Sequence, residues 1–250
     1  MDAPTPRNAV HFGLSVRAGS KYGLKIDRAT YATINKRSST YFPRERAPEL
    51  WDSLSDVYED EDHRFMTDEW CRAHQARALE NFDLNMAYFA SLDGAEFDDA
   101  INQAVKARRG MIEVTDLNDW DGRQGLYIMV LDEFKQAYVG VNVSDGGIKS
   151  RIRQHWNTNK AFDRLLWGKV DESIISIDSF RALDTTRIFA SRAQNPFTLE
   201  DKVINSIPSK FVLNRVMGGD GRSLGLGMTL GVNVGKRRDL AGTLDQPQSD

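Results

Sequence analysis

The clearest hydrophobic pattern in the chain begins at Gly125. Residues 125–131 (GLYIMVL) form an apolar run of strand length, residues 132–135 (DEFK) have the composition of a turn, and residues 136–143 (QAYVGVNV) form a second strand-like run. Aromatic and β-branched runs on either side of a polar turn are typical of a β-hairpin. We therefore predict a hairpin in which Leu131 faces Gln136 across the turn.

After this hairpin, apolar residues recur at spacings of three and four. Ile148, Ile152 and Trp156 form a stripe that predicts a helix over residues 148–156. Residues 198–201 (TLED) resemble a capping box that opens a later helix, which Pro208 ends. From residue 122 the order is strand, strand, helix, helix, strand and helix, which predicts an α/β (α+β) module with a small, mainly antiparallel sheet flanked by helices.

The first half of the chain has a different pattern. Residues 8–46 contain short alternating runs, including residues 22–33, which predict a few strands with a hairpin across residues 18–20. Residues 49–110 have apolar residues at helical spacing. We expect an N-terminal β-plus-helical extension (1–120), a module at 121–220 and a Gly-rich C-terminal tail (221–250) that frays.

Composition narrows the class of protein. Hydrophobic residues make up 40% of the chain and charged residues 28%, which is ordinary for a globular protein. No stretch approaches the roughly 18 consecutive apolar residues of a membrane span. A single cysteine, Cys71, excludes an intramolecular disulfide framework and a Cys-rich zinc site. We therefore expect no membrane partner and a reduced, cytoplasmic compartment.

Two tyrosines stand out in the predicted hairpin. In the expected register Tyr127 lies opposite Gly140 and Tyr138 lies opposite Met129, so alternation puts both phenols on one face as diagonal neighbours. Gly140 leaves a space opposite Tyr127. Two phenols and a gap could receive a phosphate, whereas a slip of one residue would separate the tyrosines.

The two triplets Gly125-Leu126-Tyr127 and Tyr138-Val139-Gly140, separated by ten residues, resemble the paired signature of the GIY-YIG nuclease family. Leu and Val replace the two Ile. Later residues follow in the family's order: Arg151, His155, Glu200 and Asn214. The resemblance, to a restriction-endonuclease-like member, covers roughly 100 of the 250 residues. Val141 stands where some members carry a lysine, which weakens any transfer of detailed phosphate contacts.

This resemblance implies an endonuclease that hydrolyses DNA phosphodiester bonds with Mg²⁺ (or Mn²⁺), at a specific site as restriction enzymes do. The implied roles are metal binding for Glu200, general base for Tyr127, charge neutralisation for Arg151, orientation of water or phosphate for Tyr138, activation of Tyr127 for His155, and support by hydrogen bonding for Asn214. A free phenol titrates near pH 10, so Tyr127 must be made more acidic or be ionised in advance.

The net charge of the chain is −3, but basic and acidic residues are concentrated in different segments. Residues 1–46 contain nine basic and three acidic residues, and residues 47–121 contain six basic and 19 acidic residues. The candidates for DNA contacts in the first segment are Arg17, Lys21, Lys25, Arg28, Lys36 and Arg37. Solvated charges on strand edges are the alternative. The acidic segment either shields the basic parts or forms contacts in a homo-oligomer.

Other readings stay open. A repair or mobile-element nuclease would share the same chemistry, and a nucleic-acid-binding module could keep the fold without catalysis. Each later residue also has an ordinary explanation, since Arg151 could be a surface charge and Asn214 a turn residue. Glu200 could simply complement the dipole of its helix.

Overall fold

The computed structural model describes residues 8–11, 13–17, 19–20, 22–37, 44–46, 48–157, 170, 173–193 and 196–214. Across these residues the fold is a mixture of helices and antiparallel sheets, which confirms the predicted mixed α/β class. The predicted Gly-rich tail, residues 221–250, lies outside the described residues.

The N-terminal strands turn earlier than predicted. Strands β1 (Asn8–His11) and β2 (Leu14–Arg17) form an antiparallel hairpin, so the expected hairpin across residues 18–20 is wrong. Gly13 lies in the turn with a φ of 69°, a conformation that only glycine adopts without strain. The expected strand over residues 22–33 is also wrong. A short helix, α1 (Arg28–Tyr31), forms there because the Asp27 side chain accepts a hydrogen bond from the Thr30 amide.

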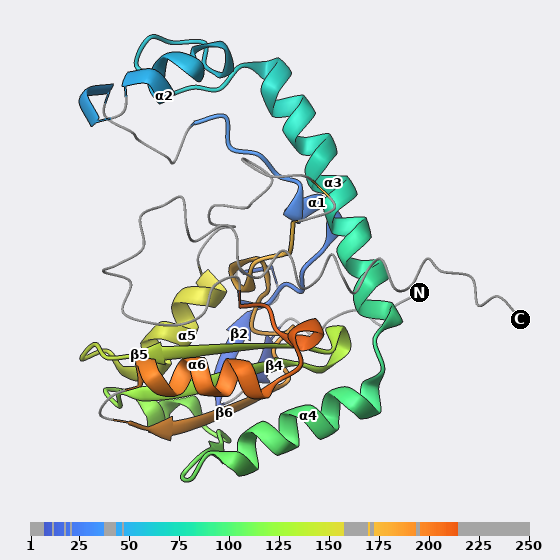
Figure 1. Ribbon diagram of the computed structural model, residues 1–250, viewed down its shortest axis with the longest axis vertical. Coiled ribbons are helices and arrows are strands. Elements are labelled where there is room, and N and C mark those ends of the chain that lie inside the picture. The colour runs from blue at the N-terminus through green and yellow to red at the C-terminus, as the bar shows by residue number, and fades with distance from the viewer. Residues whose placement is uncertain are drawn as a thin grey trace, which may run out of the picture.

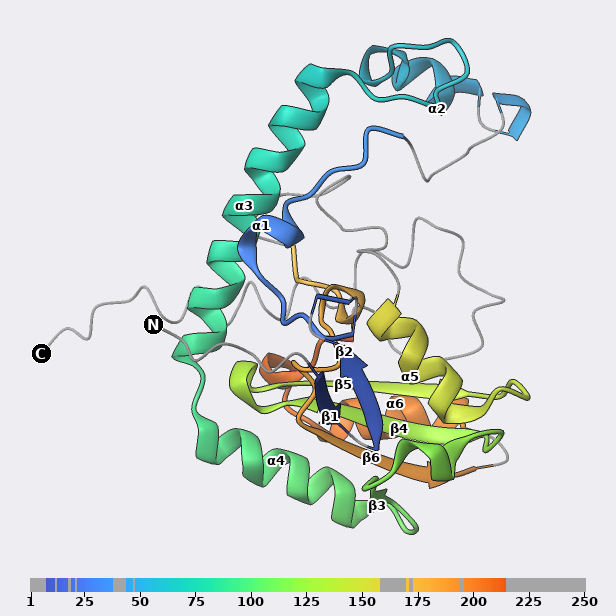
Figure 2. The same cartoon turned by 180° about the vertical axis from the view of Figure 1, so that it is seen from behind.

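Helices follow, as predicted for residues 49–110. They are α2 (Pro48–Ser53), α3 (Asp68–Ser91) and α4 (Gly94–Ala107). Figures 1 and 2 show α3 as a long helix that leads from α2 down to the sheet, where α4 begins. Short 3-10 turns connect other elements, at Arg44–Arg46, Ser55–Val57, Leu117–Trp120, Asp132–Phe134, Ile177–Ser179 and Ser209–Phe211.

The main sheet has four antiparallel strands in the order β3-β6-β4-β5. The strands are β3 (Ile112–Glu113), β4 (Gly125–Leu131), β5 (Gln136–Asn142) and β6 (Arg187–Arg192). Strand β4 is central, and all seven of its residues are buried. Because β3 precedes residue 121, the sheet includes a strand from the range assigned to the N-terminal extension.

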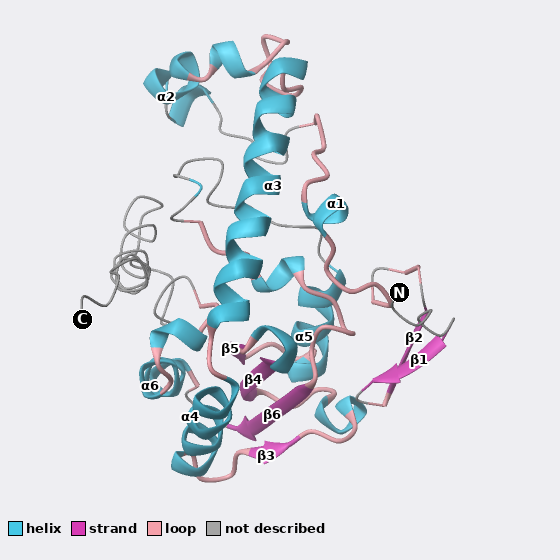
Figure 3. Ribbon diagram, turned by 90° about the vertical axis from the view of Figure 1, so that its right-hand side faces the viewer, coloured by secondary structure: helices cyan, strands magenta, loops and turns pink. Residues whose placement is uncertain are grey.

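Both faces of the sheet are covered, which explains why β4 is a continuous apolar run rather than an alternating one. Its odd-numbered residues share a core with α5 (Gly147–Asn157), and its even-numbered residues share a second core with α4 and α6 (Phe197–Ser206). Figure 3 shows the strands between α5 on one side and α4 and α6 on the other. The face that carries α5 is also the face that carries Tyr127.

The predicted stripe on α5 is confirmed. Ile148, Ile152 and Trp156 are essentially fully buried, and each such side chain contributes about 1.5–3 kcal/mol by leaving water. A second helix was predicted between α5 and β6, where residues 158–169 and 171–172 lie outside the described residues. The described residues of this segment include a 3-10 turn at Ile177–Ser179.

Candidate active site

The two tyrosines of the hairpin lie where the sequence predicted them. Strands β4 and β5 pair with Tyr127 opposite Gly140, Met129 opposite Tyr138 and Leu131 opposite Gln136. The phenol rings are diagonal neighbours on one face, with centroids 6.4 Å apart and planes inclined at 45°. The predicted register is therefore confirmed.

Gly140 makes this arrangement sterically possible. A Cβ atom at this position would lie 2.4 Å from Oη and 2.5 Å from Cζ of Tyr127, and 2.9 Å from Cε1 of Tyr138. The space opposite Tyr127 is thus filled by the tyrosine's own ring. The expectation of an open gap for a phosphate is wrong, because the phenol bends over the glycine and occupies it.

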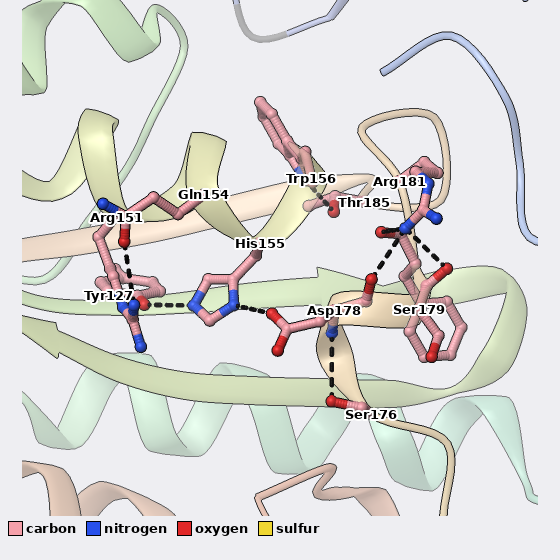
Figure 4. Close-up of polar contacts among 11 residues, drawn as sticks. Tyr127, Arg151, Gln154, His155, Trp156, Ser176, Asp178, Ser179, Arg181 and Thr185 are labelled. Carbon is pink, nitrogen blue, oxygen red and sulfur yellow. Dashed lines mark hydrogen bonds and ion pairs between the residues drawn. The ribbon is translucent and has the colours of Figure 1, made fainter. Parts of the chain in front are cut away.

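Helix α5 brings Arg151 and His155 to the tyrosines. His155 is buried, and its Nε2 lies 2.9 Å from the Tyr127 hydroxyl. Its ring also meets Tyr138 edge to face at a centroid distance of 4.9 Å. Arg151 is exposed, donates a hydrogen bond from Nη1 to Gln154 Oε1 at 3.0 Å, and extends from α5 toward Tyr127 (Figure 4). The spacing of four residues therefore directs both side chains to one place.

Asp178 completes the polar chain, and sequence reasoning missed it. Its Oδ1 lies 2.7 Å from Nδ1 of His155, on the side of the ring opposite Tyr127 (Figure 4). Asp178 belongs to the 3-10 turn Ile177–Ser179, which the Ser176 side chain caps. In sequence it is an ordinary turn carboxylate, so no local signal could have connected it with a histidine 23 residues earlier.

Glu200 approaches the same site from α6. This helix begins at Phe197 after Pro196, which makes no side-chain cap bond, so the predicted capping box at residues 198–201 is wrong. Val203, Ile204 and Ile207 are buried as expected. Glu200 itself is 8% exposed.

The pKa of Glu200 is raised to about 7, mainly by burial and also by the neighbouring Asp201 carboxylate, against the charge of Arg151, which lowers it. The guanidinium and this carboxylate are therefore within electrostatic reach of each other. Burial disfavours the ionised form of a carboxylate, and a cation placed beside it stabilises that form.

Asn214 acts on the backbone of β5. Its Oδ1 accepts from the Val139 amide at 2.9 Å, and its Nδ2 donates to the Val139 carbonyl at 2.7 Å. Val139 stands between Tyr138 and Gly140. The supporting role expected for Asn214 thus takes the form of a clamp on the strand that carries both residues.

The phenols are less acidic than catalysis by an ionised base would need. Burial raises the pKa of Tyr127 well above 10, and the neighbouring Tyr138 raises it further while Arg151 lowers it. Burial likewise raises the pKa of Tyr138 to about 12, again against the effect of Arg151. Arg151 thus acts to make Tyr127 more acidic, but burial outweighs this effect. The assignment of Tyr127 as the general base stays a prediction.

Most of the described basic residues near the N-terminus are exposed, Lys36 is partly exposed, and several of them pair with acidic side chains. Lys25 pairs with Glu133, Arg28 with Asp83, and Lys36 with both Glu59 and Asp68. Arg17 and Arg37 are exposed as well, and Lys21 lies outside the described residues. Exposed pairs of this kind contribute about 0–1 kcal/mol, so phosphates could replace the carboxylates, and the DNA-contact assignment stays a prediction.

Within the described part of the chain, no three His, Cys, Asp or Glu side chains gather as a metal-binding group. Glu200 alone would thus hold a cation through one carboxylate, with water as the other ligands, which fits the strongly hydrated Mg²⁺ ion. The same residues contain no helix long and apolar enough to cross a membrane.

No family model, curated protein or solved structure matches this chain.

Proposed function

We propose that the chain is a Mg²⁺-dependent endonuclease that hydrolyses DNA phosphodiester bonds and that it resembles the GIY-YIG nucleases. The observation that carries this proposal is the convergence of Tyr127, Tyr138, Arg151, His155 and Glu200, which come from four different elements. Phenol, guanidinium, imidazole and carboxylate together provide proton transfer and charge neutralisation, the two requirements of phosphodiester hydrolysis.

Arg151 is the residue suited to bind the phosphate. It is exposed, its guanidinium stands beside two phenols, and it donates a hydrogen bond to the neutral Gln154. A planar guanidinium can donate two parallel hydrogen bonds to phosphate oxygens and stabilise the charge that develops on them in the transition state.

Tyr127 transfers a proton rather than acting as a pre-formed phenolate. Because burial disfavours its ionised form, the neutral phenol must release its proton to His155 Nε2 as it takes one from the attacking water. The 2.9 Å contact between the two groups is a hydrogen bond along which that proton can move. Tyr138 lies beside both residues and would orient the water or the phosphate.

Glu200 would hold the Mg²⁺ ion. When bound, the ion neutralises charge on a phosphate oxygen and on the departing oxygen. The carboxylate is buried and has a pKa raised to about 7, so above neutral pH it carries a negative charge, which the nearby charge of Arg151 stabilises.

Site-specific cutting of the restriction type is the favoured setting, since a compact nuclease with a long additional segment resembles enzymes whose extra elements read a short site. The basic residues listed above would then contact DNA. A repair or mobile-element nuclease is the alternative with the same chemistry, and a catalytically inactive nucleic-acid-binding module is the alternative without it.

The test is incubation of supercoiled plasmid with purified protein and Mg²⁺, and in parallel with EDTA. We expect discrete fragments with Mg²⁺ and intact plasmid with EDTA. Glu200→Gln and Arg151→Ala should abolish cutting and leave the circular dichroism spectrum unchanged.

Matched controls separate these roles from general effects of charge. Arg153→Ala removes a guanidinium from the same helix, where it lies over the Tyr22 ring instead, and Glu113→Gln removes an exposed carboxylate from β3. Both control variants should cut as the wild type does. Full activity of Arg151→Ala or Glu200→Gln would refute the assigned role, and binding of DNA without any cutting would favour the inactive module.

A further inference from the structure

His155 is a buried imidazole held between two oxygen atoms. Its side chain is 4% exposed, with Nε2 at 2.9 Å from the Tyr127 hydroxyl and Nδ1 at 2.7 Å from Asp178 Oδ1. The groups that face the ring are Tyr127 from β4, Tyr138 from β5 and Asp178 from the 3-10 turn, while Arg151 lies one turn away on its own helix. Both ring nitrogens are therefore assigned partners.

The partners fix which nitrogen carries the proton in the neutral ring. An ionised carboxylate can only accept a hydrogen bond, so the hydrogen must be on Nδ1. Nε2 then presents its lone pair to Tyr127, whose hydroxyl donates. Tyr127 therefore donates to His155, and His155 donates to Asp178. A proton that leaves Tyr127, the proposed general base, moves toward His155 along the first of these hydrogen bonds.

The backbone around Asp178 is fixed by hydrogen bonds. Its carbonyl accepts from Arg181 Nη1 at 2.8 Å, and the same nitrogen donates to the carbonyls of Ser179 and Phe180 at 3.1 Å. The buried Asp184 carboxylate in turn accepts from the Arg181 amide at 2.8 Å and from the Ile26 amide at 3.0 Å. These bonds hold the turn in the position that presents the carboxylate to His155.

We propose that Asp178 is a positioning residue that sets the tautomer of His155 and stabilises its imidazolium form during phosphodiester hydrolysis. The proposal rests on the proposed function. As the oxygen of water bonds to phosphorus, one O–H bond of water breaks and its proton passes to Tyr127, whose own proton passes to Nε2. The Nδ1 hydrogen stays on the ring, where Asp178 accepts its hydrogen bond. The Nε2 proton afterwards returns to the Tyr127 hydroxyl, which passes its own proton to solvent, and the departing oxygen takes a proton from solvent.

Asp178→Asn is the diagnostic variant because an amide of the same shape can donate to Nδ1. The neutral ring would then carry its hydrogen on Nε2 and could no longer accept from Tyr127. We expect the kcat for plasmid cutting to fall by at least about 100-fold, the scale of general base catalysis, with the KM for DNA unchanged within about threefold.

A readout independent of cutting is the pair of ¹⁵N chemical shifts of the His155 ring, measured by NMR on the full chain. The wild type should show a protonated Nδ1 and the variant a protonated Nε2. Asp178→Glu, which keeps an acceptor-only group, should keep the wild-type tautomer even if the longer side chain lowers the rate. If Asp178→Asn fails to fold, Asp178→Glu still tests the proposal through the tautomer of His155.

Asp121→Asn is the matched structural control. Like Asp178, Asp121 is an acidic residue outside α5 that pairs with a side chain of this helix, Lys149, at 2.8 Å. Asp121 lies outside the site. Its kcat should change by less than about threefold, since the Asp121 side chain is 63% exposed and an ion pair open to water contributes little. An equal loss of activity in both variants would show that Asp178 only tethers α5, and would overturn the proposal.

Two further outcomes would also overturn it: an unchanged tautomer in Asp178→Asn, or a changed tautomer with wild-type kcat. If the wild type cuts no DNA at all, the proposed function fails. The ¹⁵N shifts then decide separately whether Asp178 sets the tautomer of His155.

Discussion

Gly140→Ala tests the steric basis of the site. The added Cβ would stand 2.4 Å from the Tyr127 hydroxyl oxygen and 2.5 Å from its Cζ. Ordinary contacts between such atoms are about 3.5–4.0 Å, so the ring must move by roughly 1 Å. Tyr127 is fully buried beside His155 and Tyr138, which leaves it little room to move.

Forcing an extra methyl group into a packed interior costs about 1–3 kcal/mol. We expect the upper part of this range, about 2–3 kcal/mol, because the atoms contacted belong to a rigid ring. For a protein of this size each kcal/mol corresponds to about 2–4 °C, so the melting temperature should fall by about 4–12 °C. Cutting should fall as well, since the displaced phenol would lose its 2.9 Å contact with His155.

Thermal unfolding followed by circular dichroism measures this effect, with Gly94→Ala as the matched control. Gly94 is the first residue of α4, and a Cβ added there meets no atom within 4 Å. Its melting temperature should stay the same or rise, because alanine favours the helix by up to about 1 kcal/mol. In a Tyr127→Ala background the cost of Gly140→Ala should shrink. An unchanged melting temperature for Gly140→Ala alone would refute this account of the hairpin.

Two further predictions concern stability. The pKa of Glu200 is raised from an ordinary 4.5 to about 7, so the folded state binds the extra proton, and stability should fall as the pH rises from about 4.5 to about 7. In EDTA, Glu200→Gln should therefore be as stable as the wild type at pH 4 and about 1–2 kcal/mol more stable at pH 8, allowing for partial access of water; parallel melting curves across this pH range would contradict the assigned burial. Asn214→Ala should lower the free energy of unfolding by about 1–3 kcal/mol, because it removes the partner of the Val139 amide and carbonyl. Urea unfolding measures this change, and a free energy of unfolding equal to that of the wild type would contradict the proposed clamp.

The central hairpin could be predicted because its determinants are local. Two apolar runs and a polar turn fix which residues face one another, and the strand period of two then puts Tyr127 and Tyr138 on one face. The same holds for α5, where spacing alone gives the buried stripe and directs Arg151 and His155 together. The predictions were wrong where two local signals compete. The first hairpin turns at Gly13 rather than at residues 18–20. Helix α6 begins at Phe197, after Pro196, and so earlier than a capping box at residues 198–201 would place it.

The spacing of apolar residues thus sufficed to predict the central hairpin with its register and the buried stripe of α5. Three features depend on how distant elements pack: the contact of Asp178 with His155, the position of the Tyr127 ring above Gly140, and the pKa values of Tyr127 and Glu200, which burial raises. The reason is physical. Periodicity and turn chemistry act over a few neighbouring residues, whereas desolvation and contacts between distant elements exist only once the chain has folded.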